Sequence, residues 1–415
     1  MNIFKLKNRN KILAWSFYDF ANQPFTTIIV TFIYSSFFIK EIAYNEDSGT
    51  VMWTNAITIT AISVSVLSPI LGVIADRSAY RKVFLMLSTW ICAIATIFLY
   101  FPEKGDIFFS LSLFIFANIA FELGTVFSNT YLHELSTNKN SGSISGFAWG
   151  LGFIGGLLAL FLAFYLFDLS DSNDIKKINI LVGIWIIIFS VPAFLLLKEK
   201  KERNFEFYYI LDSFRDIQNT FKKVSKYKII VDFLIARLFY NDGLITIFAL
   251  GGIYAVGTLD FTFNEVMLLG IVLNITAALG SFFFGYLEDK LGFKKIINIS
   301  LIVLIFATFL AYLAPEVKFS KEIFWFSGVL IGLMAGPNQS SSRSLMARLT
   351  PKEKQNEFFG FFALTGKATS FFGPFIFGIV TLFYNQQVAL WIVIFLFFIG
   401  LFLFNRINFN SLTSH

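Results

Sequence analysis

The amino-acid sequence predicts an all-α integral membrane protein with twelve transmembrane helices in two similar halves. Hydrophobic residues make up 56% of the chain and charged residues only 14%, and the mean hydropathy is +0.70. A soluble domain is about half apolar and about one quarter charged. Twelve apolar stretches are long enough to cross about 30 Å of hydrocarbon, and one loop pattern occurs twice. Together these observations indicate a chain that is solvated mainly by lipid.

The apolar stretches form two sets of six, separated by the longest polar segment. This segment, 198–228, is rich in Lys and Glu and is predicted to be a cytoplasmic linker. It divides the chain into an N-terminal six-helix half (1–197) and a C-terminal six-helix half (229–415). The predicted spans are 12–39, 51–74, 83–101, 107–133, 144–167, 179–197, 229–256, 264–287, 296–314, 322–348, 357–383 and 388–405.

The positions of the basic residues predict how the chain is oriented. The net charge is +6, but the basic residues are sorted by loop rather than gathered in one patch, so we expect no nucleic-acid partner. The side that holds the N-terminus carries 24 Lys and Arg in its loops and tails, and the other side carries 6. Because cytoplasmic loops carry the excess of basic residues, we expect both termini in the cytoplasm.

The first span carries polar residues along one side. It is too long for a cleaved signal peptide and contains Asp19, Asn22 and Gln23, so we expect it to stay as the first helix. Pro24 is a predicted kink point. An ionisable group inside a span is costly to bury and is a candidate functional residue, which makes Asp19 a candidate for the transport cavity.

The loop after the second span is repeated after the eighth. Residues 72–82 and 285–295 both follow the pattern Gly-x-x-x-Asp-basic-x-x-aromatic-basic-Lys. The glycine permits close helix contact, and the basic residues can anchor the loop at the interface. The aspartate can accept hydrogen bonds from a helix N-terminus or pair with a base. We predict a gating clasp that holds one conformation until it is broken. Its residues are Gly72, Asp76, Arg77, Arg81 and Lys82, and Gly285, Asp289, Lys290, Lys294 and Lys295.

The fourth span has the clearest polar face. Asn118, Glu122, Thr125, Asn129 and His133 are spaced by four, three, four and four residues. This spacing is typical of one side of an α-helix, so a continuous polar stripe is predicted along an otherwise apolar span. Hydrogen bonding between helices is the alternative for the amides and Thr125, whereas Glu122 favours a functional role.

Further candidate cavity residues lie in the C-terminal half. They are Arg237, Asn241 and Asp242 on the seventh span, Gln339 and Arg343 on the tenth, and Lys367 on the eleventh. Arg237 and Arg343 lie near the cytoplasmic ends of their spans, so snorkelling of both side chains to the interface is an open alternative.

The repeated loop resembles the signature of the major facilitator superfamily, and the resemblance implies that fold over the whole chain. Residues 15–22, 237–243, 341–349 and 358–374 are similar to the subgroup related to fungal vacuolar (autophagy-related) effluxers. Fungal members are implicated in releasing amino acids from the vacuole. The resemblance also implies that helices one, four, seven and ten line a central cavity. That cavity would hold five of the six ionisable residues found inside spans.

The charges inside the spans predict how the cavity works. Three acids (Asp19, Glu122 and Asp242) face three bases (Arg237, Arg343 and Lys367). A buried acid either pairs with a base or takes up a proton, and alternation between these states would couple transport to protons. We expect Glu122 to have this role, with Asp19 as second choice. Arg343 and Lys367 are expected to attract an anionic group of the substrate.

The sequence therefore predicts a secondary transporter that exports a small polar metabolite, such as an amino acid or a similar zwitterion or anion, by alternating access. Two alternatives remain open: an exporter of an amphipathic drug or lipid, and a non-transporting sensor or scaffold. No phosphate-binding glycine loop or metal-ligand pattern is present, so we expect no enzyme, no cofactor and no metal. We expect a monomer in a bacterial inner (plasma) membrane, with the lipid bilayer, a small-molecule substrate and, if transport is coupled, protons as partners.

Overall fold

Helices of membrane-spanning length make up most of the described chain. The computed structural model describes residues 6, 8–78, 80–169, 171–199, 215, 224–368 and 370–409. The first six spans are α1, η2, α2 and η3 (Arg9–Pro24, Phe25–Phe32, Tyr34–Phe37, Phe38–Ile42), α3 (Glu46–Ser78), α4 (Arg81–Phe98), α5 with α6 (Ile107–Thr130, Leu132–Leu135), α7 (Ser141–Leu166) and α8 (Ser172–Leu196). After the short η4 (Val224–Tyr227), the last six are α10 (Lys228–Leu259), α11 (Phe263–Leu291), α12 with η5 (Phe293–Leu313, Ala314–Glu316), α13 (Ser320–Leu349), α14 with α15 (Gln355–Lys367, Phe372–Phe383) and α16 (Gln386–Arg406). The prediction of twelve transmembrane helices is confirmed.

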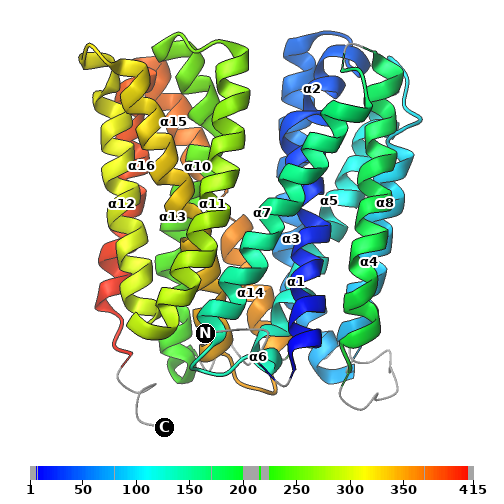
Figure 1. Cartoon of the computed structure of the whole chain (residues 1–415), viewed down its shortest axis with the longest axis vertical. Helices are drawn as coiled ribbons and strands as arrows, with labels where there is room; N and C mark the ends of the chain where they lie inside the picture. Colours follow the sequence, from blue (N-terminus) through cyan, green and yellow to red (C-terminus); the bar gives the residue numbers. More distant parts are fainter. Residues whose placement is uncertain are drawn as a thin grey trace.

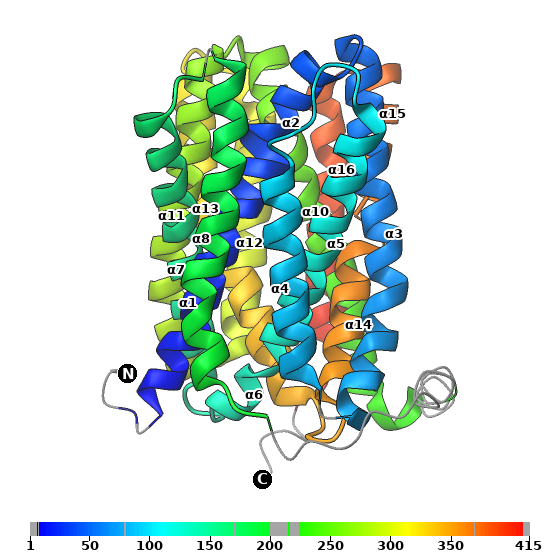
Figure 2. The same ribbon diagram turned by 90° about the vertical axis from the view of Figure 1, so that its right-hand side faces the viewer.

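The helices form two bundles that stand side by side (Figure 1). We call α1 to α8 the first bundle and α10 to α16 the second. The bundles meet along two helix pairs, α7 with α11 and α3 with α14 (Figures 1 and 2). The first helix begins and the last helix ends at the same end of the molecule. We call this end the terminal face.

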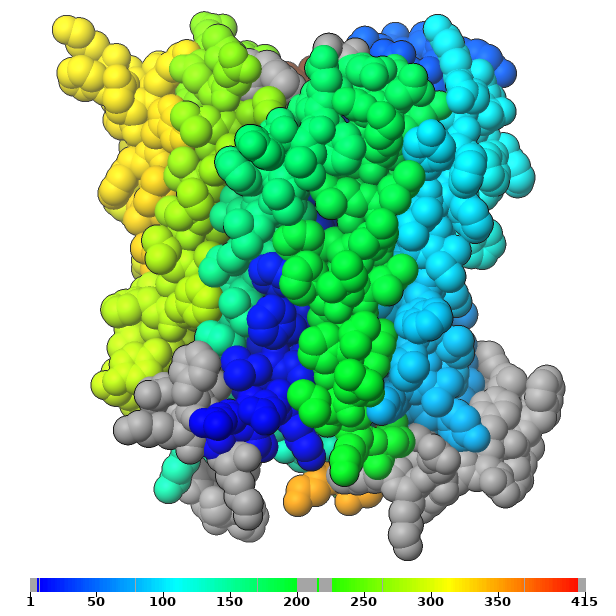
Figure 3. Space-filling view, turned by 45° about the vertical axis from the view of Figure 1, so that its right-hand side comes forward, coloured from blue at the N-terminus to red at the C-terminus, as the bar shows by residue number. Residues whose placement is uncertain are grey.

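The outer surface is apolar, and polar side chains lie in the interior beside an apolar core. In Figure 3 the helix α8 runs the height of the molecule as a green column. Its exposed side chains include Ile184, Ile188 and Leu195, whereas serines such as Ser341 on α13 are fully buried. Such a surface is stable against hydrocarbon, where no water competes for contact. The fold therefore belongs in a lipid bilayer.

The tenth span is the most polar of the twelve. In the described part of the chain, 11 helical segments are long and apolar enough to cross a membrane, and α13 is not among them. Its second half carries Asn338, Gln339 and a run of serines, and most of these side chains are buried. Because α13 packs between α11 and α12, protein rather than lipid surrounds its polar groups.

The eleventh span, predicted over 357–383, consists of two helices. The helix stops after Lys367 and restarts at Phe372. Pro374 explains the restart, because proline lacks a backbone N–H and its ring clashes with the carbonyl four residues earlier. Proline is tolerated within the first turn of a helix, where the N–H groups have no helical partner. Pro374 occupies that turn of α15.

Two other spans also depart from a regular α-helix. The first span changes from α-helix to π-helix directly after Pro24, the predicted kink point. The fourth span ends at Thr130, and His133 belongs to the separate short helix α6. The prediction of an unbroken polar stripe is therefore wrong for the step from Asn129 to His133, because α5 ends between these residues. Most of the predicted linker, 198–228, lies outside the described residues.

Candidate functional site

Two acid–base pairs join the bundles near the middle of the spans. The Lys367 Nζ atom on α14 lies 2.6 Å from the Glu122 Oε1 atom on α5. Both residues are partly exposed, with side chains 32% and 17% accessible. Each lies about ten residues from the end of its helix at the terminal face, which corresponds to roughly 15 Å at 1.5 Å per residue. An ion pair that is buried on one side and accessible on the other can open to admit a ligand.

The second pair is Arg343 on α13 and Asp19 on α1. The Arg343 Nη1 atom donates to the Asp19 Oδ2 atom at 2.7 Å and to the Asn129 Oδ1 atom at 3.2 Å. The same guanidinium donates to the side chain and the carbonyl of Ser145 on α7 and lies over the Trp15 ring. Arg343 is buried, so the open alternative that it snorkels to the interface is wrong.

The polar amides lie around these pairs. Gln339 donates from Nε2 to the Asn241 Oδ1 atom at 2.9 Å, which links α13 to α10 inside the second bundle. Asn22 and Asn118 are buried and Gln23 is half-buried, all in the first bundle. The structure brings Asp19, Asn129 and Arg343 into direct contact, but it does not join Asp242 to any of the predicted bases.

Arg237 is held inside the second bundle. It is buried, its guanidinium lies 3.5 Å from the centre of the Phe362 ring, and its Nη1 atom donates to the Phe362 carbonyl at 2.8 Å. Among the described residues, no acid lies within ion-pair distance of it. The snorkelling alternative is therefore wrong for Arg237 as well.

The first copy of the loop pattern contacts the second bundle. Asp76 accepts hydrogen bonds from the backbone N–H groups of Asn356 and Glu357 at 3.0 and 2.8 Å, and from the Asn356 side chain at 2.7 Å. These N–H groups belong to the second and third residues of α14, which have no partner within the helix. Gly72 lies against the same segment, because a Cβ atom there would clash with the Asn356 carbonyl.

The second copy repeats this geometry in the opposite direction. Asp289 accepts from the N–H groups of Gly142 and Ser143 at 3.0 and 3.1 Å. These are again the second and third residues of a helix, here α7 of the first bundle. A Cβ atom on Gly285 would lie 2.8 Å from the Gly146 Cα atom. Each bundle therefore caps a helix of the other bundle at the terminal face.

The basic residues of the two copies have different surroundings. Arg81 is buried, pairs with Glu134 at 3.1 Å and lies over the Tyr131 ring, so the expectation that it anchors the loop at the interface is wrong. Lys290 is exposed and lies 4.4 Å from the centre of the Tyr286 ring, and Lys294 donates to the Ile407 carbonyl at 3.4 Å. Arg77 and Lys82 are half-buried, and Lys295 is exposed.

Glu199 joins this group from the start of the linker. Its Oε2 atom accepts from the Lys82 N–H at 2.6 Å, and its Oε1 atom lies 3.8 Å from the Arg81 guanidinium. Burial raises the pKa of Glu199, and Arg81 and the Lys82 N–H partly oppose this shift.

A buried carboxylate was missed in the second loop copy. Glu288 is fully buried and accepts hydrogen bonds from Ser341 and Ser344, each at 2.6 Å, and from Arg348 at 3.1 Å. Arg348 also donates to the Ser141 Oγ atom at 2.7 Å across the interface. The sequence signal was present, because an acid directly after the predicted eighth span replaces the alanine (Ala75) of the first copy.

The described contacts close the terminal face. Among the described residues, the hydrogen bonds and ion pairs between the bundles lie at the level of the two acid–base pairs or between that level and the terminal face. The described residues contain no cluster of three or more His, Cys, Asp or Glu side chains that could hold a metal ion. Chemically, the site offers paired charges that a zwitterion or an anion can replace.

Comparison with known proteins agrees with this arrangement. Residues 36–413 match the family described as vacuole effluxer Atg22 like. The chain is 25% identical to the uncharacterized MFS-type transporter YxiO of Bacillus subtilis, over 94% of this chain and 92% of that protein. It is 23% identical to autophagy-related protein 22 of Kluyveromyces lactis, over 90% and 88% of the two chains. The proton:xylose symporter XylE has the same fold, with a TM-score of 0.71 at 13% identity over 98% and 96% of the chains.

Proposed function

The chain belongs to the family of vacuole effluxer Atg22-like proteins and is a major facilitator transporter, and we propose that it exports a small zwitterionic or anionic metabolite, such as an amino acid. It is an integral membrane protein and not an enzyme. The proposed location is a bacterial inner membrane, with the terminal face in the cytoplasm because most basic residues of the loops lie on that side.

The two acid–base pairs between the bundles carry this proposal. The carboxylate of a zwitterionic ligand can replace Glu122 as the partner of Lys367. The ammonium group of the same ligand can then pair with Glu122. The Lys367–Glu122 separation of 2.6 Å leaves no room for such a ligand. Binding therefore requires the pair to open, and the ligand stabilises the open pair by replacing both partners. A zwitterion can replace both partners, whereas an anion replaces only Glu122, which can then take up a proton.

Transport follows because the acid–base pairs and the two copies of the loop pattern all join the bundles. Each pair joins the two bundles, so replacing one of its partners by a ligand removes a contact that holds the terminal face closed. A ligand shifts a conformational equilibrium only through a difference in its affinity for the two states. In this proposal, the difference arises because the ligand competes with the contacts between bundles. Glu122, once separated from Lys367, is free to take up a proton and couple transport to pH.

The experiment is a thermal-shift screen of the purified, detergent-solubilised protein. The probes are amino acids, peptides, organic acids, nucleosides and lipophilic cations, tested on the wild type, on Lys367→Ala and on Lys321→Ala. Lys321 is the matched control, because it forms an ion pair of 3.0 Å with Glu265 within the second bundle. We expect a zwitterionic or anionic class to stabilise the wild type and the control but not Lys367→Ala.

Two results would change this assignment. Stabilisation by lipophilic cations alone would favour an exporter of amphipathic drugs or lipids. Equal stabilisation of the wild type and Lys367→Ala by the same amino acid would remove Lys367 from the binding site. Proton coupling is tested separately with Glu122→Gln in proteoliposomes that contain the ligand found in the screen. Transport by this variant is expected to lose its dependence on pH, and an unchanged dependence would contradict the proton role of Glu122.

A further inference from the structure

Three side chains of α10 hold the broken ends of the eleventh span. At the end of α14, Arg237 donates to the Phe362 carbonyl at 2.8 Å and Asn241 donates to the Gly366 carbonyl at 3.3 Å. At the start of α15, the Asp242 Oδ2 atom accepts from the Gly373 N–H at 3.0 Å. The C-terminal end of a helix carries partial negative charge and the N-terminal end partial positive charge. The cation and the carboxylate of α10 each face the helix end of opposite sign.

This arrangement leaves Asp242 without a basic partner. Asp242 is 1% exposed, and its Oδ1 atom has no hydrogen-bond partner among the described residues. Other charged groups on the elements packed against α10 are engaged elsewhere: Arg343 with Asp19, and Lys367 with Glu122. Arg237, on the same helix, donates to α14. The helix α15 carries no charged residue, and the only one on α16 is Arg406 at its last position.

The other ionisable groups of α10 and α11 lie away from Asp242 or are bonded elsewhere. Tyr240 bonds to Ser342. The acids and the lysine of α11 lie in its first or its last turn. Asp19 and Glu122 are thus each paired with a cation, whereas the Asp242 side chain accepts one bond, from the Gly373 N–H, among the described residues.

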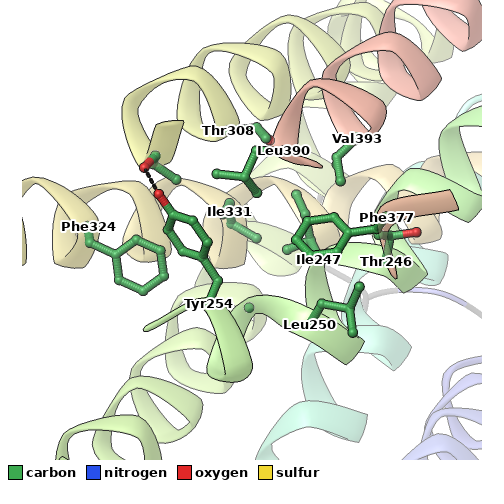
Figure 4. A pocket seen from close by; sticks show the side chains of 12 residues that line it. Thr246, Ile247, Leu250, Tyr254, Thr308, Phe324, Ile331, Phe377, Leu390 and Val393 are labelled. Atoms are coloured by element: carbon green, nitrogen blue, oxygen red, sulfur yellow. Dashed lines mark hydrogen bonds between the residues drawn. The ribbon is translucent and has the colours of Figure 1, made fainter. Parts of the chain in front are cut away.

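A small pocket with a mostly apolar lining lies one helical turn from Asp242. Thr246, one turn further along α10, donates to the Asp242 carbonyl at 2.7 Å and lines a small pocket inside the second bundle. Figure 4 shows this pocket between α10 and its neighbours, with Ile247, Phe377 and Leu390 among the side chains that face it. A carboxylate that is buried without a cationic partner neutralises rather than keep its charge in such surroundings.

We propose that Asp242 is a proton-binding site that controls the break in the eleventh span. The proton binds to Oδ1 and converts the carboxylate into a neutral carboxylic acid. This step deepens the proposed function and rests on it, since it supplies a proton site separate from the substrate pairs. A neutral acid accepts the Gly373 N–H bond more weakly than a carboxylate does, so protonation loosens α15 from α10. Lys367, at the other end of the break, then becomes easier to separate from Glu122.

Infrared titration of the purified protein tests the proton site without any substrate. The carbonyl stretch of protonated carboxylic acids is followed between about pH 9 and about pH 5 in the wild type, Asp242→Asn and Glu122→Gln. We expect one pH-dependent component to be lost in Asp242→Asn and kept in Glu122→Gln. Asp242→Glu should keep a titrating component at a shifted position. Identical titrations of the wild type and Asp242→Asn would overturn the proposal.

Amide hydrogen exchange tests the mechanical consequence. At one fixed pH, where intrinsic exchange rates are equal, Asp242→Asn mimics the neutral acid. The peptide that contains Gly373 is expected to exchange about tenfold faster in this variant, the change expected when a charge-assisted hydrogen bond becomes a neutral one. Glu265→Gln is the control with unchanged exchange there, because Glu265 caps the start of α11 and pairs with Lys321. Unchanged exchange in Asp242→Asn would refute control of the break. Because neither measurement uses a ligand, failure of the transport assignment would leave both results interpretable.

Discussion

Arg343 and Asp19 form a contact that joins three helices of the first bundle to one helix of the second. The distance between the Arg343 Nη1 and Asp19 Oδ2 atoms is 2.7 Å, and three further N–H groups of the guanidinium bond to Asn129 and Ser145. Asp19, Asn129 and Ser145 lie on α1, α5 and α7. A lysine cannot replace this arrangement, because its ammonium group lacks the planar fork of arginine.

Loss of this contact is expected to open the terminal face. Arg343→Ala leaves Asp19, whose side chain is 17% exposed, without a cation. Breaking a fully buried pair costs about 3–5 kcal/mol, and partial exposure of Asp19 lowers this cost. Arg343→Lys should retain part of the stability. The readout is the labelling rate of Ala347→Cys by a membrane-impermeant maleimide, since Ala347 is 2% exposed in the closed structure. Cys92 is replaced by Ser in this background, as it is the single cysteine of the chain.

A double-mutant cycle separates the ion pair from the other contacts of Arg343. Asp19→Asn should also raise the labelling rate of Ala347→Cys. The effect of the double variant, Arg343→Ala with Asp19→Asn, on the free energy of opening should be smaller than the sum of the two single effects. Strict additivity of the two changes would show that the pair does not hold the face closed.

Asp76 and Asp289, the aspartates of the two loop copies, should contribute unequally to closing the terminal face. Asp76→Ala removes the carboxylate that binds the start of α14, and the residue before it is Ala75 rather than an acid. Asp289→Ala leaves Glu288 in place, which keeps its bond to Arg348. We therefore expect faster labelling of Ala347→Cys in both variants, with the larger effect in Asp76→Ala. The set of ligands that bind in the thermal-shift assay should stay unchanged. A change in which ligands bind to Asp76→Ala would instead place Asp76 near the binding site.

Much of the fold could be predicted because transmembrane spans are long and apolar, and their loops carry sorted charge. The loop pattern left two roles open for Asp76, and the structure shows the helix N-terminus as its partner. The partners could not be predicted, since the Lys367–Glu122 contact joins positions 245 residues apart in the sequence. Pro374 gave a local signal for the break in the eleventh span. Its exact extent depends on Arg237 and Asp242, which stabilise the two helix ends from another helix.

A single methyl group at Gly146 should prevent the terminal face from closing. A Cβ atom there would meet the Ser281 carbonyl and would lie 2.7 Å from the Gly285 Cα atom, and neither backbone group can rotate away. Gly146→Ala should therefore separate α7 from α11 and raise the labelling rate of Ala347→Cys. Gly251→Ala is the matched control, because nothing lies within 4 Å of a Cβ atom at that position. Equal labelling of the two variants would mean that the helices close without this contact.

Glu199 should make the stability of the terminal face depend on pH. Burial raises the pKa of Glu199 above its ordinary value of 4.5, although Arg81 and the Lys82 N–H oppose the shift. The folded protein then holds this proton at pH values where the unfolded chain has lost it. The free energy of unfolding is therefore expected to fall as pH rises from the ordinary pKa through the raised pKa of Glu199, and to change little at higher pH. Glu199→Gln removes this contribution, because its amide does not titrate. The measurement is the thermal unfolding temperature of the wild type and the variant across this range, with Glu265→Gln as a control in the second bundle. Parallel curves for the wild type and Glu199→Gln would show that Glu199 does not bind a proton on folding.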